Sequence, residues 1–175
     1  MRFSICVFFV TILWHSMSTP VCAATPSSLR SLAGVTAMYV AVEDLNGTTR
    51  KIGLKKEQIQ AVAETYLNEH NIKLSKTGGN GIPILYLRVS SVVGGDHPQA
   101  PISFYLTVQV KQFAQLAQSQ NGTTAQDTDE APLLVTTWEE GTMVMTNRAA
   151  LGFYVRQVLL NVLGELLQDY QDAKK

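Results

Sequence analysis

The sequence predicts an α+β domain, a two-layer sandwich in which two helices cover one face of an antiparallel sheet, with element order β-α-β-β-β-α. Three patterns support this class: alternating apolar residues in the middle of the chain, a helical stripe before them, and a longer helical stripe at the C-terminus. Helices segregated from consecutive strands are typical of α+β folds, and the first crossover should be right-handed. No repeat of about 20 to 50 residues is visible.

The first expected strand covers residues 35–43, where β-branched and aromatic residues dominate. A helix is expected from Lys55 to Asn71 because apolar residues recur there at i, i+3, i+4, i+7 and i+8. The glycine-rich stretch 76–81 breaks the chain before a second strand at residues 84–93. The glycines of 76–81 indicate a turn and not a phosphate-binding loop, because they precede a strand instead of opening a helix.

The clearest alternation lies in residues 102–115, with one set of residues facing the core and the other facing water. Residues 94–101 form a Gly- and Pro-rich loop, and residues 118–130 form a polar insertion at a hairpin tip. A further strand follows at 133–139, and Glu140-Gly141 either bulges it or turns it before residues 142–145. Thr146 or Asn147 then caps the final helix, which runs to Tyr170 and is apolar over a wide arc.

The N-terminus has the pattern of a secretory signal peptide. Arg2 supplies positive charge, an apolar run spans Ile5 to Trp14, and Val21-Cys22-Ala23 places small residues before a cleavage point near Ala23 or Ala24. The apolar run is shorter than the roughly 20 residues that span a bilayer, so no stable membrane insertion is expected. We therefore divide the chain into a signal peptide (1–23), a linker (24–31) and a single α+β domain (32–175).

Both cysteines, Cys6 and Cys22, lie within the predicted signal peptide, so the exported domain contains none. A cysteine-free exported domain fits a bacterial periplasm better than an animal extracellular space, and the predicted location is periplasmic or secreted. Lipidation of Cys22 would need a small residue directly before it, and because Val21 occupies that position, lipidation is not favoured. The chain has 14 basic and 14 acidic residues without a basic stripe, and we expect no nucleic-acid partner.

Residues that could carry chemistry are sparse, and we expect neither an enzyme nor a metal or cofactor site. His70 falls at a helix end, where it can cap carbonyl groups, and Asp96-His97 falls on a loop. The acidic pair Glu139-Glu140 is adjacent in sequence, which gives no support for two carboxylates held across a cleft. We rank a hydrolase that uses these groups last among the functional hypotheses.

A binding surface is the alternative to a catalytic site. Exposed tyrosine and arginine on a sheet face are favoured at protein interfaces, although each such residue can also be an ordinary cross-strand pair. Trp138 is ambiguous in the same way, as a core anchor or as an interface residue. The candidate interaction residues are Tyr86, Arg88, Tyr105, Gln109, Lys111 and Trp138.

Three segments also carry a resemblance: L-x-G-V-x-x-x-Y-V-A-V-E-D-L at 32–45, Y-L-N-E-H-N-I at 66–72 and T-T-W-E at 136–139. With this order of elements, the chain resembles a group of uncharacterised small exported bacterial proteins. It is similar, more loosely, to periplasmic envelope-assembly domains such as the amino-terminal domain of TolB and the lipoprotein activators of cell-wall synthases. The resemblance implies a binding module without catalytic residues of its own.

The leading hypothesis is therefore a non-enzymatic protein-interaction module of the cell envelope, which uses the exposed sheet face and the apolar side of the 148–170 helix. Its partner would be an envelope protein or a second copy, with that helix pairing across a two-fold axis as a possible homodimer. The alternative is a carrier of a small apolar ligand between the sheet and the C-terminal helix. Its pocket would be lined by Met145, Phe153, Tyr154 and Leu160.

Overall fold

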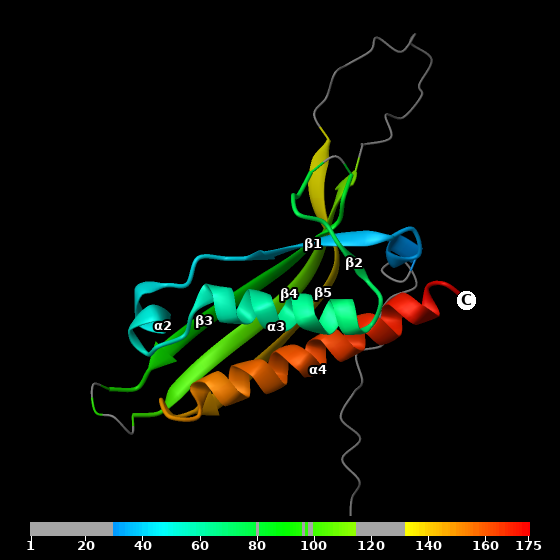
Figure 1. The fold of residues 1–175 in the computed structure, drawn as a ribbon. Coiled ribbons are helices and arrows are strands. Elements are labelled where there is room, and N and C mark those ends of the chain that lie inside the picture. The colour runs from blue at the N-terminus through cyan, green and yellow to red at the C-terminus, as the bar shows by residue number, and fades with distance from the viewer. Residues whose placement is uncertain (1–29, 80, 96, 98–99, 115–131) are drawn as a thin grey trace, which may run out of the picture.

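A computed structural model describes residues 30–79, 81–95, 97, 100–114 and 132–175 (Figure 1). The predicted signal peptide 1–23, the linker up to residue 29 and the polar insertion 118–130 lie outside the described residues. The elements in chain order are β1 (Ala37–Val42), α2 (Gly47–Lys51), α3 (Lys56–Glu69), β2 (Lys73–Leu74), β3 (Ile84–Val93), β4 (Ile102–Ala114), β5 (Leu133–Thr146) and α4 (Leu151–Asp172).

The α+β class is confirmed, but the sheet is mixed and not antiparallel throughout. Its strand order is β2-β1-β3-β4-β5, in which β1 pairs in parallel with both β2 and β3 while β3, β4 and β5 form an antiparallel meander. The reason is the helical crossover after β1, which returns the chain to the end of the sheet where β1 began. The sequence also gave no signal for the two-residue strand β2 or for the short helix α2.

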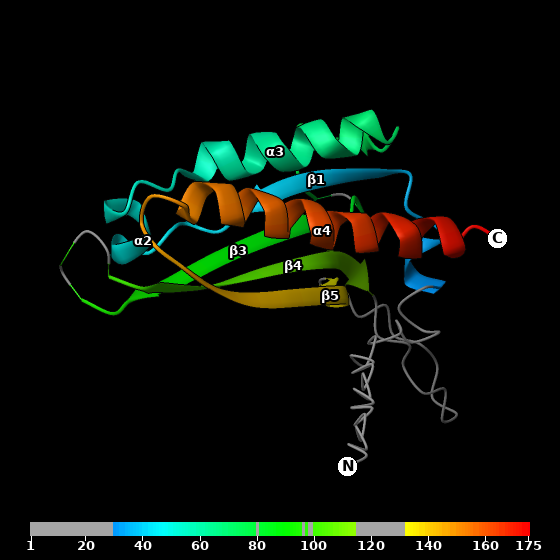
Figure 2. The same cartoon turned by 90° about the horizontal axis from the view of Figure 1, so that it is seen from below.

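Both long helices lie on the same side of the sheet, as predicted (Figure 2). Alternate residues of each central strand point toward them and are fully or almost fully buried. Phe104 and Leu106 of β4 and Leu85 and Leu87 of β3 are each at most 1% exposed. The core is therefore one layer of apolar side chains between the sheet and the two helices.

Helix α3 ends at Glu69, shortly before the predicted end at Asn71, and its termination has a clear local cause. Asn71 adopts a left-handed conformation with φ 59°, and the Ile72 amide donates a hydrogen bond of 3.0 Å to the Leu67 carbonyl. This is the pattern of a Schellman motif, in which the buried Ile72 also closes the end of the helix against the core. The chain reverses direction at this motif and continues directly into β2.

Helix α4 begins later than predicted, at Leu151, because residues 148–150 form a turn. The Asn147 side chain closes this turn and does not cap the helix: its Oδ1 accepts a hydrogen bond of 3.0 Å from the Ala150 amide, while the helix N-cap, Ala150, has no side-chain cap hydrogen bond. The wide apolar arc of α4, which suggested a free interaction surface, is buried inside the fold. It packs against β4, β5 and α3 through Leu151, Val155, Val158, Leu159, Val162, Leu163, Leu166 and Tyr170.

This packing predicts opposite outcomes for two substitutions in α4. Leu163→Ala should lower the free energy of unfolding by about 2–5 kcal/mol, because the side chain is 1% exposed and its removal leaves a cavity. Phe153→Ala should change it by less than about 0.5 kcal/mol, because Phe153 is 62% exposed. Urea unfolding followed by circular dichroism measures both. Similar effects at the two positions would contradict the buried placement of the α4 arc.

Candidate functional site

Five of the six predicted interaction residues lie on the face of the sheet that carries no helix, which we call the open face. Tyr86 and Arg88 reach it from β3, and Tyr105, Gln109 and Lys111 reach it from β4, all at positions that alternate with buried core residues. Tyr86 lies directly opposite Gln109 in the β3–β4 pairing. Strand alternation therefore brings these side chains together without any special loop.

A polar network joins β1 to β3 on the open face. The Tyr86 hydroxyl donates a hydrogen bond of 2.9 Å to Glu43 Oε2, and Arg88 Nε lies 3.3 Å from the same oxygen. Lys111 Nζ sits 3.7 Å from the centroid of the Tyr86 ring, a cation–π contact. Sequence reasoning missed Glu43 as a member and placed it only at the end of the first expected strand, 35–43. The parallel pairing of β1 with β3 is what brings Glu43 to Tyr86.

The network changes the acidity of its tyrosine. Burial, then the hydrogen bond to Glu43 and the charge of that carboxylate, raise the pKa of Tyr86 above its usual 10.0, while the Arg88 charge acts in the opposite direction. Tyr86 therefore stays a neutral hydrogen-bond donor across the physiological pH range. It holds Glu43 in place, and Arg88, whose side chain is 60% exposed, remains available to a partner.

An apolar patch occupies the other end of the open face. Tyr105 lies opposite Met143, and Met145 lies opposite Ser103, which in turn pairs with Val92. The exposed fractions are 44% for Tyr105, 71% for each methionine and 72% for Val92. Sequence reasoning found only Tyr105 here, although strand alternation from Thr142 onward was a signal for the methionines.

Gly141 allows Tyr105 to lie flat across the open face. A Cβ atom at position 141 would meet the Tyr105 hydroxyl and its ring carbon Cζ well inside van der Waals contact. The ring therefore covers the glycine backbone of the neighbouring strand. Thr107, which pairs with Gly141 on the open face, is itself only 4% exposed.

Trp138 is the exception among the predicted residues and faces the helices. It is 5% exposed, and its Nε1 donates a hydrogen bond of 2.8 Å to Asp169 Oδ2 on α4. The cause is a β-bulge: Val110 pairs with Trp138 while Lys111 pairs with Thr136, so Thr137 is an extra residue. Strict alternation from Thr136 would have placed Trp138 on the open face. It is a core anchor and not part of the interaction surface.

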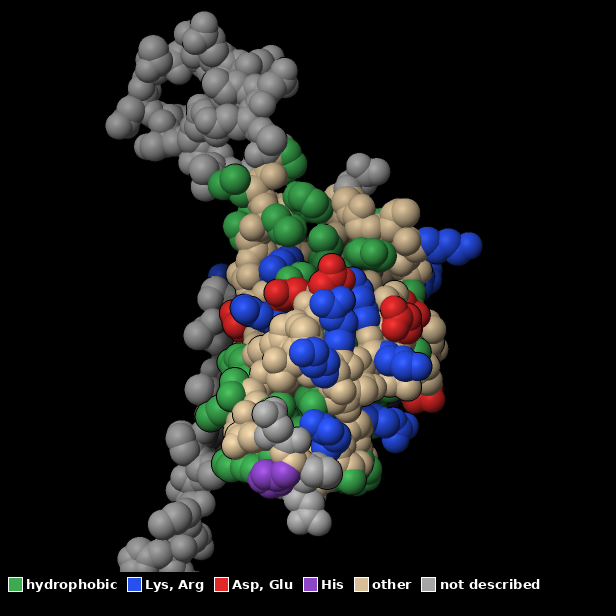
Figure 3. Space-filling model, turned by 90° about the vertical axis from the view of Figure 1, so that its left-hand side faces the viewer, with side chains coloured by type: hydrophobic (Ala, Val, Ile, Leu, Met, Phe, Trp, Pro, Cys, Tyr) green, Lys and Arg blue, Asp and Glu red, His purple; other side chains and the backbone are tan. Residues whose placement is uncertain are grey.

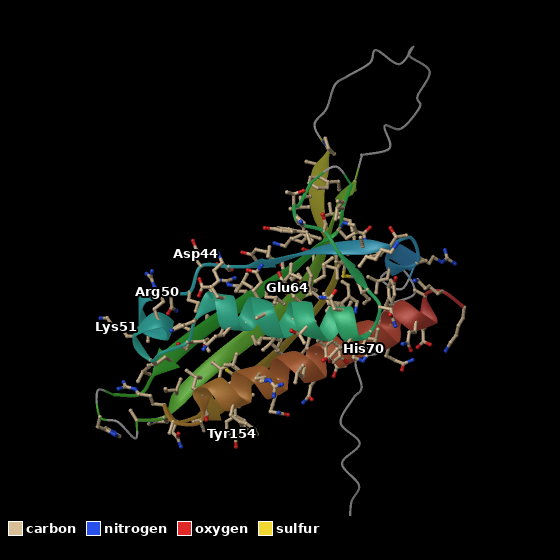
Figure 4. All side chains as sticks on the ribbon, in the orientation of Figure 1. Asp44, Arg50, Lys51, Glu64, His70 and Tyr154 are labelled. Carbon is tan, nitrogen blue, oxygen red and sulfur yellow. The ribbon has the colours of Figure 1, made fainter. Side chains whose placement is uncertain are left out.

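The described residues that were considered for catalysis do not lie together in one site. The ring Nδ1 of His70 lies 2.8 Å from the Tyr66 carbonyl at the end of α3, as expected for a capping histidine (Figure 4). His97 is exposed, and Asp96 lies outside the described residues. Glu139 pairs with Gln109 and Glu140 with Val108, so the two carboxylates lie on opposite faces of β5. In the described part of the chain, no cluster of three His, Cys, Asp or Glu side chains could hold a metal ion.

The residues proposed to line a ligand pocket are also not assembled. Met145, Phe153 and Tyr154 are 71%, 62% and 42% exposed, and the buried arc of α4 fills the space above the sheet. Leu160 instead borders a shallow groove between α3 and α4, together with Val62, Tyr66 and Arg156. The structure therefore contradicts the expected apolar pocket at these four positions.

Charged side chains gather at the end of the molecule that carries α2. Figure 3 looks at this end and shows Lys and Arg side chains with Asp and Glu side chains among them. One such pair is Lys56 and Asp44, whose Nζ and Oδ1 atoms lie 2.7 Å apart, which lowers the pKa of Asp44. No helix within the described ranges is both long and apolar enough to cross a membrane.

No protein-family model matches the chain, and no curated protein matches its sequence. Among solved structures, a minor lipoprotein from Acinetobacter baumannii is similar with 11% identity and a TM-score of 0.32, over 79% of this chain and 92% of that one. A neuraminyllactose-binding hemagglutinin homolog from Helicobacter pylori has 8% identity and a TM-score of 0.34, over 77% of this chain and 85% of that one. At these scores the similarities carry no argument about function, and the likeness to TolB stays a prediction.

The polar network predicts a measurable change in the ionisation of Tyr86. Glu43→Gln removes a negative charge beside the hydroxyl, so the pKa of Tyr86 should fall toward its usual value. NMR titration of tyrosine-labelled protein, with the Tyr86 signal assigned through Tyr86→Phe, measures this shift. Asp44→Asn is the matched control and should have a smaller effect, because Asp44 is the smallest contributor. An unchanged Tyr86 pKa in Glu43→Gln would contradict the network.

The contact between Tyr105 and Gly141 predicts a coupled effect on stability. Gly141→Ala should lower the free energy of unfolding by about 1–3 kcal/mol, because the added methyl group forces the Tyr105 ring to move. The same change in a Tyr105→Ala background should cost less, since the ring is gone. Denaturant unfolding of the four proteins in this double-mutant cycle measures the coupling. Equal costs in both backgrounds would show that the ring does not lie over the glycine.

Proposed function

We propose that this protein is an exported, non-enzymatic protein-interaction module of the bacterial cell envelope, periplasmic or secreted, that binds its partner on the open face of the sheet. The observation that carries the proposal is the composition of that face. It combines the Glu43–Tyr86–Arg88 network with the exposed apolar patch of Val92, Tyr105, Met143 and Met145. Aromatic residues, methionine and arginine are the residue types enriched at protein interfaces.

The arrangement of this face supports binding more than simple sheet stabilisation. Cross-strand pairs that only stabilise a sheet need no exposed methionine, whereas both methionines here are 71% exposed on an edge strand. The ion pair with Glu43 restrains Arg88 beside this patch, which reduces the side-chain entropy lost when Arg88 contacts a partner. A flat surface with an apolar part and a fixed cation suits a folded protein partner with an acidic rim.

The export and the non-enzymatic character in this proposal are supported by separate observations. The N-terminal charge, apolar run and small residues before the cleavage point support export. The non-enzymatic assignment is supported by the way the candidate acids and histidines are scattered over different faces and ends of the described fold.

Photo-crosslinking in intact cells tests the proposal. A photo-reactive residue at Arg88 or at Lys111 should capture the same envelope protein, because both positions lie on the open face. Asn161, an exposed position on α4, is the matched control and should capture little or none of it. Adding Met143→Asp and Met145→Asp should reduce capture at Arg88 at least about tenfold, through lost apolar contact. Equal capture from Asn161, or none from either open-face position, would contradict the proposed surface.

A further inference from the structure

Strand β5 is a long sheet edge whose C-terminal part, residues 142–146, lacks the usual protection against pairing. In the order β2-β1-β3-β4-β5 it is the last strand and is 14 residues long, whereas the opposite edge strand, β2, has two residues and begins with a lysine. Among the described residues, only β4 pairs with β5, so one side of its backbone has no strand partner. Natural edges are protected by charges, prolines, bulges or short length. Residues 142–146 have no charge and no proline, and the bulge lies outside them.

The sequence of this segment reads the same in both directions. Residues 142–146 read Thr-Met-Val-Met-Thr, which is symmetric about Val144. When two identical antiparallel strands are related by a two-fold axis, the residue at the axis lies opposite its own copy. A residue that lies n positions after it in one strand lies opposite the residue n positions before it in the other strand. With the axis at Val144, each threonine faces a threonine and each methionine faces a methionine.

We propose that β5 pairs with β5 of a second copy, antiparallel and in the register that places Val144 opposite Val144. Met143 then lies beside Met145 of the partner subunit on the open face. Four methionine side chains that are each 71% exposed in the single chain become one contiguous apolar cluster. New backbone hydrogen bonds between the two edges add to this burial, as in other cases of strand addition.

The match of side chains selects this register over its neighbours. With the axis at Val144, Thr142 meets Thr146 of the partner subunit, Met143 meets Met145 and Val144 meets its own copy. Moving the axis to Met143 places Glu140 opposite Thr146 and Met145 opposite Gly141. Moving it to Met145 places Met143 opposite Asn147, beyond the end of β5. Only the axis at Val144 pairs both methionines with methionines and both threonines with threonines.

The dimer goes beyond the proposed function and does not depend on it. Pairing along β5 continues the sheet from one subunit into the other, so both open faces point to the same side. Arg88 and Lys111 lie on β3 and β4, inward from the β5 edge, and stay accessible. The two proposals share Met143 and Met145, but capture at Arg88 or Lys111 tests the open face and the Val144→Cys disulfide tests the edge, so the failure of one is distinguishable from the failure of the other.

Single cysteines test the register in a full chain whose Cys6 and Cys22 are replaced by serine. Val144→Cys should form a disulfide-linked dimer on mild oxidation, because directly opposite Cα atoms lie about 4.5–5.5 Å apart, within reach of a disulfide. Thr142→Cys is the matched control: its own copy lies four residues away along the strand, about 13 Å, and it should stay monomeric. A mixture of Thr142→Cys and Thr146→Cys chains should form the mixed disulfide.

A charge pair placed in the segment gives a second, independent readout by sedimentation equilibrium without crosslinking. Met143→Asp should raise the dissociation constant of the dimer about tenfold, and adding Met145→Lys should restore it, because the proposed register places these two positions opposite each other. Glu139→Arg is the control, since Glu139 lies outside residues 142–146. Disulfides at Thr142→Cys as fast as at Val144→Cys, a purely monomeric wild type, or no rescue by the added Met145→Lys would each overturn the proposal.

Discussion

The fold depends on one constraint: its sheet is covered on a single face. Helix α4 packs across β4 and β5, and α3 packs against β1 and α4, so all helical burial falls on one side. The central strands satisfy this by strict alternation, with Leu85, Leu87 and Leu106 fully buried and their neighbours turned outward. The opposite face therefore has to be stable in water, and its surface consists of a polar network, one shielded glycine and an apolar patch.

The bulge at Thr137 decides which β5 residues belong to which face. Before it, Thr136 shares the open face with Lys111; after it, Trp138 turns to the helices and binds Asp169 on α4. The same shift of phase places Met143 and Met145 outward beside Tyr105. One inserted residue thus produces both the tryptophan anchor that fixes α4 to the sheet edge and the exposed methionines of the proposed surfaces.

Periodicity predicted the parts of this structure that follow from alternation or helical spacing. It located α3, β3, β4 and α4, the common side of the two helices, and the open-face positions of Tyr86, Arg88, Tyr105, Gln109 and Lys111. It could not predict the parallel neighbours of β1, because strand pairing is a non-local property. For the same reason Glu43 was missed, since its partner Tyr86 lies 43 residues away. Trp138 was ambiguous because a bulge leaves no distinct pattern in its own strand.

The one-sided sheet also connects the face and the edge. A helix on the second face would have to bury Met143, Met145 and Tyr105, and would then restrict access to the β5 backbone from that side. No described element covers this face, and in the proposed dimer the methionines next to the edge are buried by the second copy. The proposed edge contact costs little conformational entropy, because β5 is already paired with β4 and Trp138 is hydrogen-bonded to Asp169. The open face thus follows from placing both long helices on one side, and the free edge follows from the position of β5 at the end of the strand order.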